Sequence, residues 1–283
     1  MGAAALAAVL LPSAHAQLNI SGSWPALPPA GFVRELGVSP VSLPDLPPLV
    51  TPVVVPRMSA ELALQTYEAR SYVQGSRLLT YSDQTVMVAS LPDTKQRGEY
   101  ELTRQYSAPN SLRFTPLRFE GDNFVKSNVL VRLLQSEVDH VTRQQGPETA
   151  ISSQNYKFSP KAVENVDNRF CYVFQVKPRK KRVGLFKGKI YIDAYTGALV
   201  RAEGQMVKSP SIFIKKLSFV QDYVDVDGFM LPVHLHSEAK VRIIGRAVVD
   251  VFHRGYKATA AAVAQSGSTL VSSSDSAKVQ GSE

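Results

Sequence analysis

The sequence predicts an α+β fold in which a strongly curved antiparallel β-sheet, an incomplete barrel, has helices covering its concave face. Three observations lead to this fold class. Residues 168–256 contain about six short segments in which apolar and polar residues alternate, as they do in half-buried strands. Short polar turns join these segments, so neighbouring strands must be antiparallel, because a parallel pair needs a long crossover. Two segments with helical spacing, 59–70 and 122–141, supply the covering helices.

The first 57 residues are predicted to lie outside the folded domain. Residues 1–16 have the features of a secretory signal peptide, with an apolar run at Ala3–Leu11 and Ala14-His15-Ala16 before a cleavage point at Gln17. Residues 17–57 contain half of the chain's 18 prolines. Proline fixes φ and lacks an amide donor, so this segment is expected to be an extended linker.

The rest of the chain is predicted to form one domain, residues 58–257, followed by a disordered tail, residues 258–283. The tail is rich in Ala, Ser, Gly and Gln and shows no periodicity. No stretch after the signal reaches the ~18 apolar residues of a membrane helix, so the protein is expected to be exported in soluble form. The single cysteine, Cys171, excludes an intrachain disulfide, and the core alone has to stabilise the fold.

The first half of the domain is predicted to be a helix, four strands and a second helix. Ser59 is placed to cap the helix at 59–70. In 122–141 apolar residues recur at helical spacing around most of the circumference, with Asp122 as N-cap, so this helix should pack on two sides. A strand at Asn128–Leu134 is the alternative. The four strands are expected at 71–82, 85–91, 98–107 and 111–119.

The second half is predicted to be strands alone. In 168–177, Phe170, Tyr172, Phe174 and Val176 alternate with the other side chains and should share one face. Cys171 then lies on the opposite face and is interpreted as a small buried hydrophobe. The later strands are expected on both sides of a turn at Asp193–Gly197, and at 211–224, 227–240 and 241–253.

The net charge of +8 indicates anionic partners, namely nucleic acid, acidic lipid or an acidic protein. Export makes nucleic acid the least expected of these. The densest basic run ends in Arg179, Lys180, Lys181 and Arg182, at a turn between two predicted strands. Two interpretations stay open: a solvated hairpin tip, or a contact with acidic lipid headgroups or an acidic partner.

The sequence offers no convincing catalytic or metal site. His234 and His236 share one face of a strand, but two histidines are too few for a structural zinc site. Asp222, Asp225 and Asp227 surround a turn, where Asp is expected for its geometry. Motifs such as GxSxG, HExxH and the Walker sequence are missing. Binding is therefore favoured over catalysis, with no cofactor and no metal, and a hydrolase using Asp222, Asp225 and His234 is only a third hypothesis.

Residues 188–256 resemble the C-terminal half of periplasmic lipoprotein-sorting proteins, the family of LolA-like carriers, LolB-like receptors and RseB-like stress sensors. The matching segments are YIDAYTGALVRAEG (191–204), FIKKLSFVQDYVDVDGFMLP (213–232) and GRAVVDV (245–251). The resemblance implies a periplasmic location and an incomplete barrel with helices as a lid over an apolar cavity that takes acyl chains.

Together these observations predict an exported, non-enzymatic carrier whose partners are the acyl chains of a lipid or lipoprotein. Transient contact with an anionic membrane through Arg179–Arg182 is expected, and no binding of nucleic acid. The alternative is an envelope sensor or structural module of the same fold that binds a protein partner. For each candidate lining residue, ordinary dry core is the competing interpretation. The candidates are Phe170, Tyr172, Phe174, Leu130 and Leu134.

Overall fold

The structure is a computed structural model, and it describes residues 58–226, 229–242 and 244–261. In this part of the chain ten strands form one antiparallel sheet. The strands are β1 (Leu78–Leu91), β2 (Gln96–Ser107), β3 (Ser111–Gly121), β4 (Tyr156–Val166), β5 (Arg169–Pro178), β6 (Phe186–Asp193), β7 (Leu199–Met206), β8 (Ile214–Val226), β9 (Phe229–Val241) and β10 (Gly245–Ala260).

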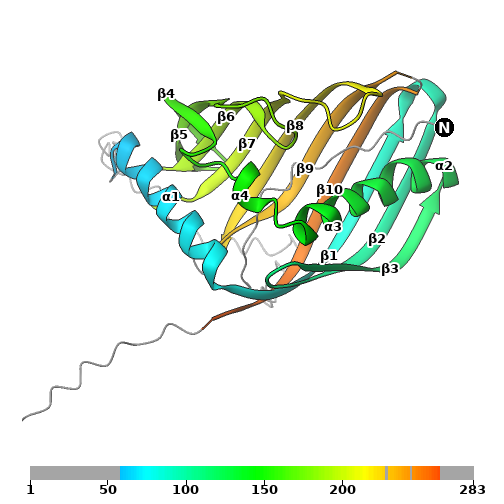
Figure 1. Ribbon diagram of the computed structural model, residues 1–283, viewed down its shortest axis with the longest axis horizontal. Coiled ribbons are helices and arrows are strands. Elements are labelled where there is room, and N and C mark those ends of the chain that lie inside the picture. Colours follow the sequence, from blue (N-terminus) through cyan, green and yellow to red (C-terminus); the bar gives the residue numbers. More distant parts are fainter. Residues whose placement is uncertain (1–57, 227–228, 243, 262–283) are drawn as a thin grey trace, which may run out of the picture.

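The sheet has the strand order β3-β2-β1-β10-β9-β8-β7-β6-β5-β4, and within the described residues β3 and β4 remain as edges. It is curved, and the helices lie on one of its faces (Figure 1). The predicted fold class, an open antiparallel sheet with covering helices, is confirmed. The helical segments are α1 (Ala60–Arg77), the 3₁₀ turn η1 (Pro92–Thr94), α2 (Asn123–Val125), the π-helix η2 (Lys126–Leu130), α3 (Val131–Thr142) and α4 (Gly146–Thr149).

Helix α1 begins where the sequence predicts but ends later. The Ser59 side chain accepts a hydrogen bond from the Leu62 amide at 3.2 Å. The helix continues to Arg77, so the strand predicted at 71–82 is wrong over its first half. Gln74 explains the difference, because it is buried and its side-chain amide bonds both the amide and the carbonyl of Met230 on β9.

The predicted helix at 122–141 is confirmed, and the strand alternative is wrong. The helix does not pack on two sides as expected, because Phe124 and Val131 are 41% and 42% exposed. The Asp122 side chain caps it by accepting a hydrogen bond from the Phe124 amide at 2.7 Å. In η2 the Val131 amide bonds the carbonyl of Lys126, five residues earlier. Short π turns inside an α-helix are rare and often mark functional positions.

Two strand predictions need correction. Residues 78–91 form the single strand β1, not two strands, because Asp83 in its middle is buried rather than placed in a turn. Strand β4 was not predicted, because residues 159–165 are all exposed at the sheet edge and therefore show no apolar alternation.

The predicted ends of the domain are tested only in part. Strand β10 includes residues 258–260, so the predicted tail starts inside the sheet. The predicted signal peptide (1–16), the proline-rich linker (17–57) and the tail from residue 262 lie outside the described residues. In the part that is described, no helix combines the length and apolarity needed to cross a bilayer.

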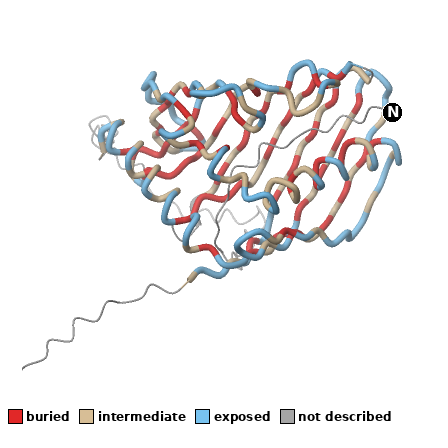
Figure 2. Tube along the Cα trace, in the orientation of Figure 1, coloured by how far each residue is buried: buried red, intermediate tan, exposed pale blue. Residues whose placement is uncertain are grey.

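The main core lies between the concave face of the sheet and the helices. Figure 2 shows buried positions along the strands and in the helices. A second cluster joins the ends of β1, β3, β9 and β10, and consists of Leu78, Tyr81, Leu112, Phe229, Leu231 and Tyr256. A third, smaller cluster is on the convex face and consists of Val166, Cys171, Val173, Tyr191 and Val200. Cys171 is fully buried, as predicted.

Candidate functional site

Four of the five predicted lining residues belong to the main core or pack against it, but the structure does not bring all four to one place, because the helix that carries Leu130 and Leu134 lies over β1–β3 and not over β5. Leu130, Leu134 and Phe174 belong to the main core, and Tyr172 packs against it. Phe170 is half-buried and lies outside this core, although it shares the alternation of Tyr172 and Phe174. Leu130 is 0% and Phe174 2% exposed, so a ligand has to displace part of this packing to reach them.

Helix α1 is fixed to one half of the sheet by several contacts. Tyr67 donates a hydrogen bond to the Ile151 carbonyl at 2.9 Å, and Arg70 donates to the Thr196 carbonyl at 2.7 Å. Gly197 has φ of +66°, and a Cβ there would lie 2.6 Å from Thr66 of the helix. Only glycine meets both conditions without strain, so the turn between β6 and β7 is built to receive α1.

A charged cluster under α3, on the concave face, was not predicted. Arg104 of β2 is 1% exposed. Its guanidinium donates to Asp83 at 2.7 Å, to Glu137 at 2.9 Å and to the Tyr256 hydroxyl at 3.1 Å. The guanidinium carbon also lies 4.9 Å from the centre of the Tyr81 ring. We call Tyr81, Asp83, Arg104, Glu137, His253 and Tyr256 the Arg104 cluster.

The Arg104 cluster connects a helix to three strands. Glu137 belongs to α3, whereas Asp83 is on β1, Arg104 on β2 and His253 on β10. The His253 ring donates from Nδ1 to Asp83 at 3.2 Å and lies 3.0 Å from the Thr85 hydroxyl. Because the guanidinium nitrogens already have these protein partners, the cluster is suited to holding α3 on the sheet rather than to catalysis.

Burial and pairing set the charges of this cluster. Burial opposes ionisation of Asp83, but Arg104 and the hydrogen bonds from His253 and Thr85 hold the pKa of Asp83 well below its usual range. Burial raises the pKa of Glu137, and Arg104 offsets part of this effect. Burial and the positive charge of Arg104 lower the pKa of His253 to about 4, so its imidazole is neutral at pH 7.

This neutral histidine predicts a pH dependence of stability. Unfolded His253 takes up a proton below its ordinary pKa of 6.5, whereas folded His253 does so only below about 4. Between these values the unfolded state binds more protons, so this residue's contribution to stability falls as the pH falls. Glu137, whose folded pKa is raised, contributes with the opposite sign.

The measurement that isolates His253 compares thermal unfolding of the wild type and His253→Asn between pH 6.5 and about 4. The advantage of the wild type should shrink steadily as the pH falls. An advantage that stays constant over this range would contradict the assignment of a neutral, buried imidazole.

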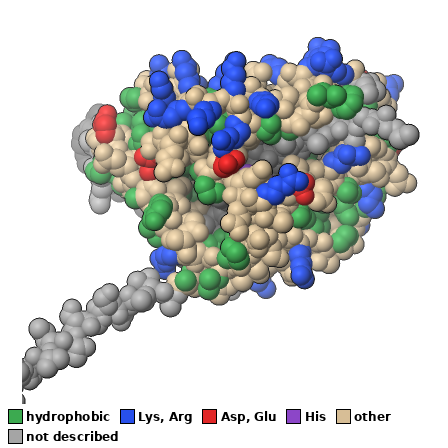
Figure 3. All heavy atoms as spheres, in the orientation of Figure 1, with side chains coloured by type: hydrophobic (Ala, Val, Ile, Leu, Met, Phe, Trp, Pro, Cys, Tyr) green, Lys and Arg blue, Asp and Glu red, His purple; other side chains and the backbone are tan. Residues whose placement is uncertain are grey.

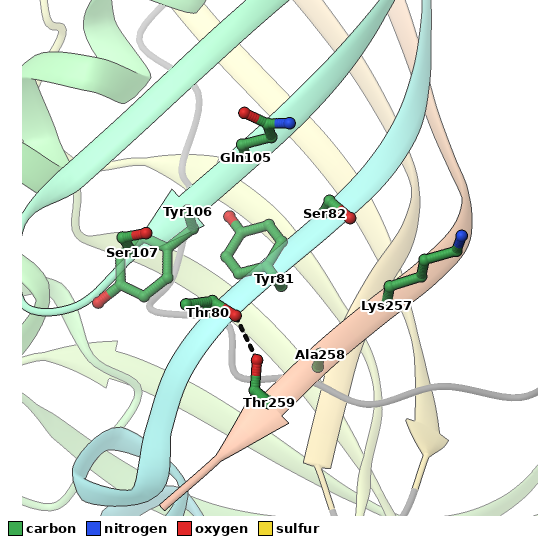
Figure 4. A pocket seen from close by; sticks show the side chains of 9 residues that line it. All are labelled: Thr80, Tyr81, Ser82, Gln105, Tyr106, Ser107, Lys257, Ala258 and Thr259. Atoms are coloured by element: carbon green, nitrogen blue, oxygen red, sulfur yellow. Dashed lines mark hydrogen bonds between the residues drawn. The ribbon is translucent and has the colours of Figure 1, made fainter.

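A pocket of about 330 Å³ lies at one end of β1, β2 and β10 (Figure 4). The rings of Tyr81 and Tyr106 stack beside it with centroids 5.2 Å apart. The rest of its lining is mostly polar, with Thr80, Ser82, Gln105, Ser107, Lys257, Ala258 and Thr259. None of the predicted lining residues contributes to it, and hydroxyl and amide groups suit an acyl chain poorly.

The predicted basic run lies in the turn between β5 and β6, and the structure divides it into two kinds of residue. Arg179 donates to the carbonyls of Ser153 and Tyr156 at 2.8 and 3.2 Å. Arg182 pairs with Glu148 at 2.9 Å. Lys180 and Lys181 are exposed and form no ion pair with the described residues, so these two are available to an external anion.

The two histidines of β9 do share a face, as predicted. His234 and His236 both bond Asp250 of β10, at 3.0 and 2.9 Å. Asp222, a member of the hypothetical acid–base group, is held by Arg201. Among the described residues no group of three or more His, Cys, Asp or Glu is arranged to hold a metal ion.

Comparisons with known proteins give a family model and several structures. A family of unknown function, DUF5686, matches residues 147–258, which include β4 to β9 and most of β10 and amount to less than half of the chain. No curated protein matches.

Three of the matching structures illustrate the result. A LolA superfamily protein from Nitrosomonas europaea is 11% identical, with a TM-score of 0.34, over 71% of this chain and 93% of that one. A domain from Vibrio parahaemolyticus assigned to outer membrane lipoprotein sorting is 12% identical, with a TM-score of 0.36, over 74% and 94%. MucB of Pseudomonas aeruginosa, in complex with MucA, is 11% identical, with a TM-score of 0.23, over 71% and 100%.

The family that the sequence resembles is thus represented among the matching structures. Identities of 12% or less and TM-scores below 0.5 are too low to transfer a function to this chain.

Proposed function

We propose that this protein is an exported, non-enzymatic carrier that holds an acyl chain of a lipid or lipoprotein between the concave face and the helix formed by α2, η2 and α3. The observation that supports this most is the composition of the interface. Leu130 and Leu134 of the helix share one apolar core with Met87 of β1 and Leu102 of β2, the strands that lie beneath it. A ligand that separates helix from sheet would meet apolar side chains on both sides.

The helix has the features of a movable lid. Its α3 part is tied to the sheet by the ion pair between Glu137 and Arg104. At its other end the π turn η2 interrupts the regular hydrogen bonding between α2 and α3. Sharp bends in helices occur at π turns, so η2 is the expected hinge.

The energies favour acyl binding over an empty, opened state. Burying a chain of about a dozen CH₂ groups contributes roughly 10 kcal/mol at ~0.8 kcal/mol per group. Breaking one charged hydrogen bond costs on the order of 1.5–3 kcal/mol. The gain from an acyl chain exceeds the cost of this hydrogen bond, and the chain itself replaces the apolar contacts that α3 gives up with the sheet, so polar contacts are needed only to orient the ligand.

Two residues of α3 provide a matched test of this function. Leu134 is 9% exposed and faces the core, whereas Val131, one turn earlier, is 42% exposed. In a titration with a fluorescent long-chain fatty acid, Leu134→Asn should weaken binding about tenfold or more, since it replaces buried apolar surface by an amide. Val131→Asn should bind like the wild type.

Circular dichroism of both variants establishes that they are folded, and native mass spectrometry of the wild type should show a co-purifying lipid. Equal binding by the two variants, or a wild type that takes up no fatty acid after delipidation, would refute the carrier function.

The second candidate is an envelope protein that binds a partner at a sheet edge. Strand β4 supports it, because residues 159–165 of this edge strand are all exposed. An exposed edge can accept an extended segment of another protein as an additional strand. This candidate would be favoured over the carrier if native mass spectrometry gave the mass of the protein without lipid and a pull-down recovered a protein partner.

A further inference from the structure

The turns at the two ends of the strands differ in charge. In an antiparallel sheet, successive turns alternate between the two ends of the strands. The turns β1–β2, β5–β6, β7–β8 and β9–β10 lie in a row at the same end of the strands (Figure 1). We call this row of turns the basic edge; it is distinct from the edge strands β3 and β4. The sequences of these turns contain Lys95, Arg179, Lys180, Lys181, Arg182, Lys208 and Arg242. The described turns at the opposite end of the strands contain no lysine or arginine; they are residues 108–110, 167–168 and 194–198.

Most cations of the basic edge face solvent. Figure 3 shows Lys and Arg side chains gathered along it. Arg182 pairs with Glu148 and Arg179 bonds two carbonyls, so these two are partly satisfied within the protein. The others are exposed and form no ion pair with the described residues, and the same holds beside the turns for Lys215, Lys216 and Lys240.

Two apolar side chains project from the same edge. Ile212, in the turn between β7 and β8, is 80% exposed, and Val183, in the turn between β5 and β6, is 37% exposed. The turn of Ile212 has a defined shape, because the Ser209 hydroxyl lies 2.8 and 2.6 Å from the carbonyl oxygens of Ser211 and Ile214 and shares its single proton between them. Ile212 is flanked in the sequence by Lys208, Lys215 and Lys216.

We infer that the basic edge docks on an anionic lipid bilayer, with Ile212 and Val183 inserted among the headgroups and acyl ends. This rests on the membrane contact expected of a carrier and adds the docking surface. A line of cations shared by several turns matches an extended anionic surface by charge. Exposed aliphatic tips between lysines match the apolar layer directly beneath the headgroups. An acidic protein surface would pair with the cations, but it would not offer the apolar layer beneath the charges that Ile212 requires.

Flotation with vesicles tests this, using the full chain and phosphatidylcholine vesicles with or without phosphatidylglycerol. The wild type should bind only the anionic vesicles, and less at high salt. Ile212→Ser should lower binding about tenfold. Its control is Leu117→Ser, since Leu117 is 58% exposed on β3, away from the turns, and should bind like the wild type.

The contribution of charge is tested by a triple variant, Lys208→Ser, Lys215→Ser and Lys216→Ser. Each free lysine near the surface contributes up to ~5-fold, so most low-salt binding should be lost. The charge-matched control replaces Arg113, Lys161 and Lys257, which are exposed and outside the basic edge. Equal binding by the two triple variants, or a wild type that ignores anionic vesicles, would overturn the inference.

Insertion itself has a spectroscopic signature. A polarity-sensitive fluorophore on Ile212→Cys should shift to the blue with anionic vesicles, and the same fluorophore on Leu117→Cys should not. Cys171 does not compete for the label, because it is 0% exposed and burial raises the pKa of its thiol to about 11. No shift at position 212 would also overturn the inference.

Fatty-acid binding without vesicles separates this inference from the proposed carrier function. A protein that takes up fatty acid and ignores vesicles refutes edge docking alone, whereas one that docks and takes up no fatty acid refutes only the carrier.

Discussion

Arg104→Leu is expected to destabilise the fold by about 3–5 kcal/mol, because it leaves two buried carboxylates without their cation. The side chains of Asp83 and Glu137 are 0% and 9% exposed, so water cannot replace the guanidinium. Urea unfolding followed by circular dichroism gives the free energy of unfolding directly. Loss of the cation should also raise the pKa of Asp83 toward its ordinary value, since only His253 and Thr85 then oppose the effect of burial.

The control for this substitution is Arg118→Leu on β3. Arg118 also contacts two carboxylates, Glu101 and Glu120, at 3.6 and 3.0 Å, but its side chain is 55% exposed. Exposed ion pairs contribute about 0–1 kcal/mol, so its loss should be small. A similar stability change in both variants would mean that Arg104 is not the buried centre of the cluster. Adding Asp83→Asn and Glu137→Gln to Arg104→Leu should recover part of the loss, since neutral amides are cheaper to bury.

Phe174→Glu is the second substitution with a large expected effect. Phe174 is 2% exposed within the main core, so the variant buries a carboxylate among apolar side chains and loses an aromatic ring. The cost is on the order of several kcal/mol, enough to abolish a marginally stable fold. Thermal unfolding should show a strongly lowered melting temperature or no transition.

Phe170→Glu is the matched control, because Phe170 lies four residues earlier on the same strand, is half-buried and is outside the core. Phe170→Glu should lower the melting temperature clearly less than Phe174→Glu does. If Phe174→Glu melts like the wild type and still takes up fatty acid, the side chain does not face the interior, and the assignment of the concave face of β5 is wrong.

A strand could be predicted from the sequence where apolar and polar residues alternate along it. Strands β5 to β10 all bury their concave face, and β5 to β7 also bury part of the convex face in the third cluster. The period of two in residues 168–256 reveals these strands directly. Strand β4 has no such period, since its middle is exposed on both faces. The extension of α1 to Arg77 depends on Gln74 and its contact with Met230, 156 residues away, which no local pattern contains.

The Arg104 cluster escaped prediction for a related reason, although its signals are in the sequence. Arg104 occupies the inward position of an alternation that also includes Tyr100 and Leu102. Glu137 likewise lies on the buried ridge of α3 with Leu133 and Leu134. Taken alone, each charged residue looks like the position at which a row of buried apolar side chains ends. Only the fold shows that the two inward charges meet, because their partners are distant along the chain.

The π turn η2 also determines which way α3 is rotated. A regular helix turns by about 100° per residue, so removing one residue from Lys126–Leu130 would rotate everything after it by about that angle. The start of the helix could not follow, because Asp122 is held there by hydrogen bonds from Phe124 and Gln96. Glu137 would then point away from Arg104. The number of residues in this segment is therefore as strictly constrained as their identity, and a single deletion should separate the helix from its ion pair while leaving every paired side chain present.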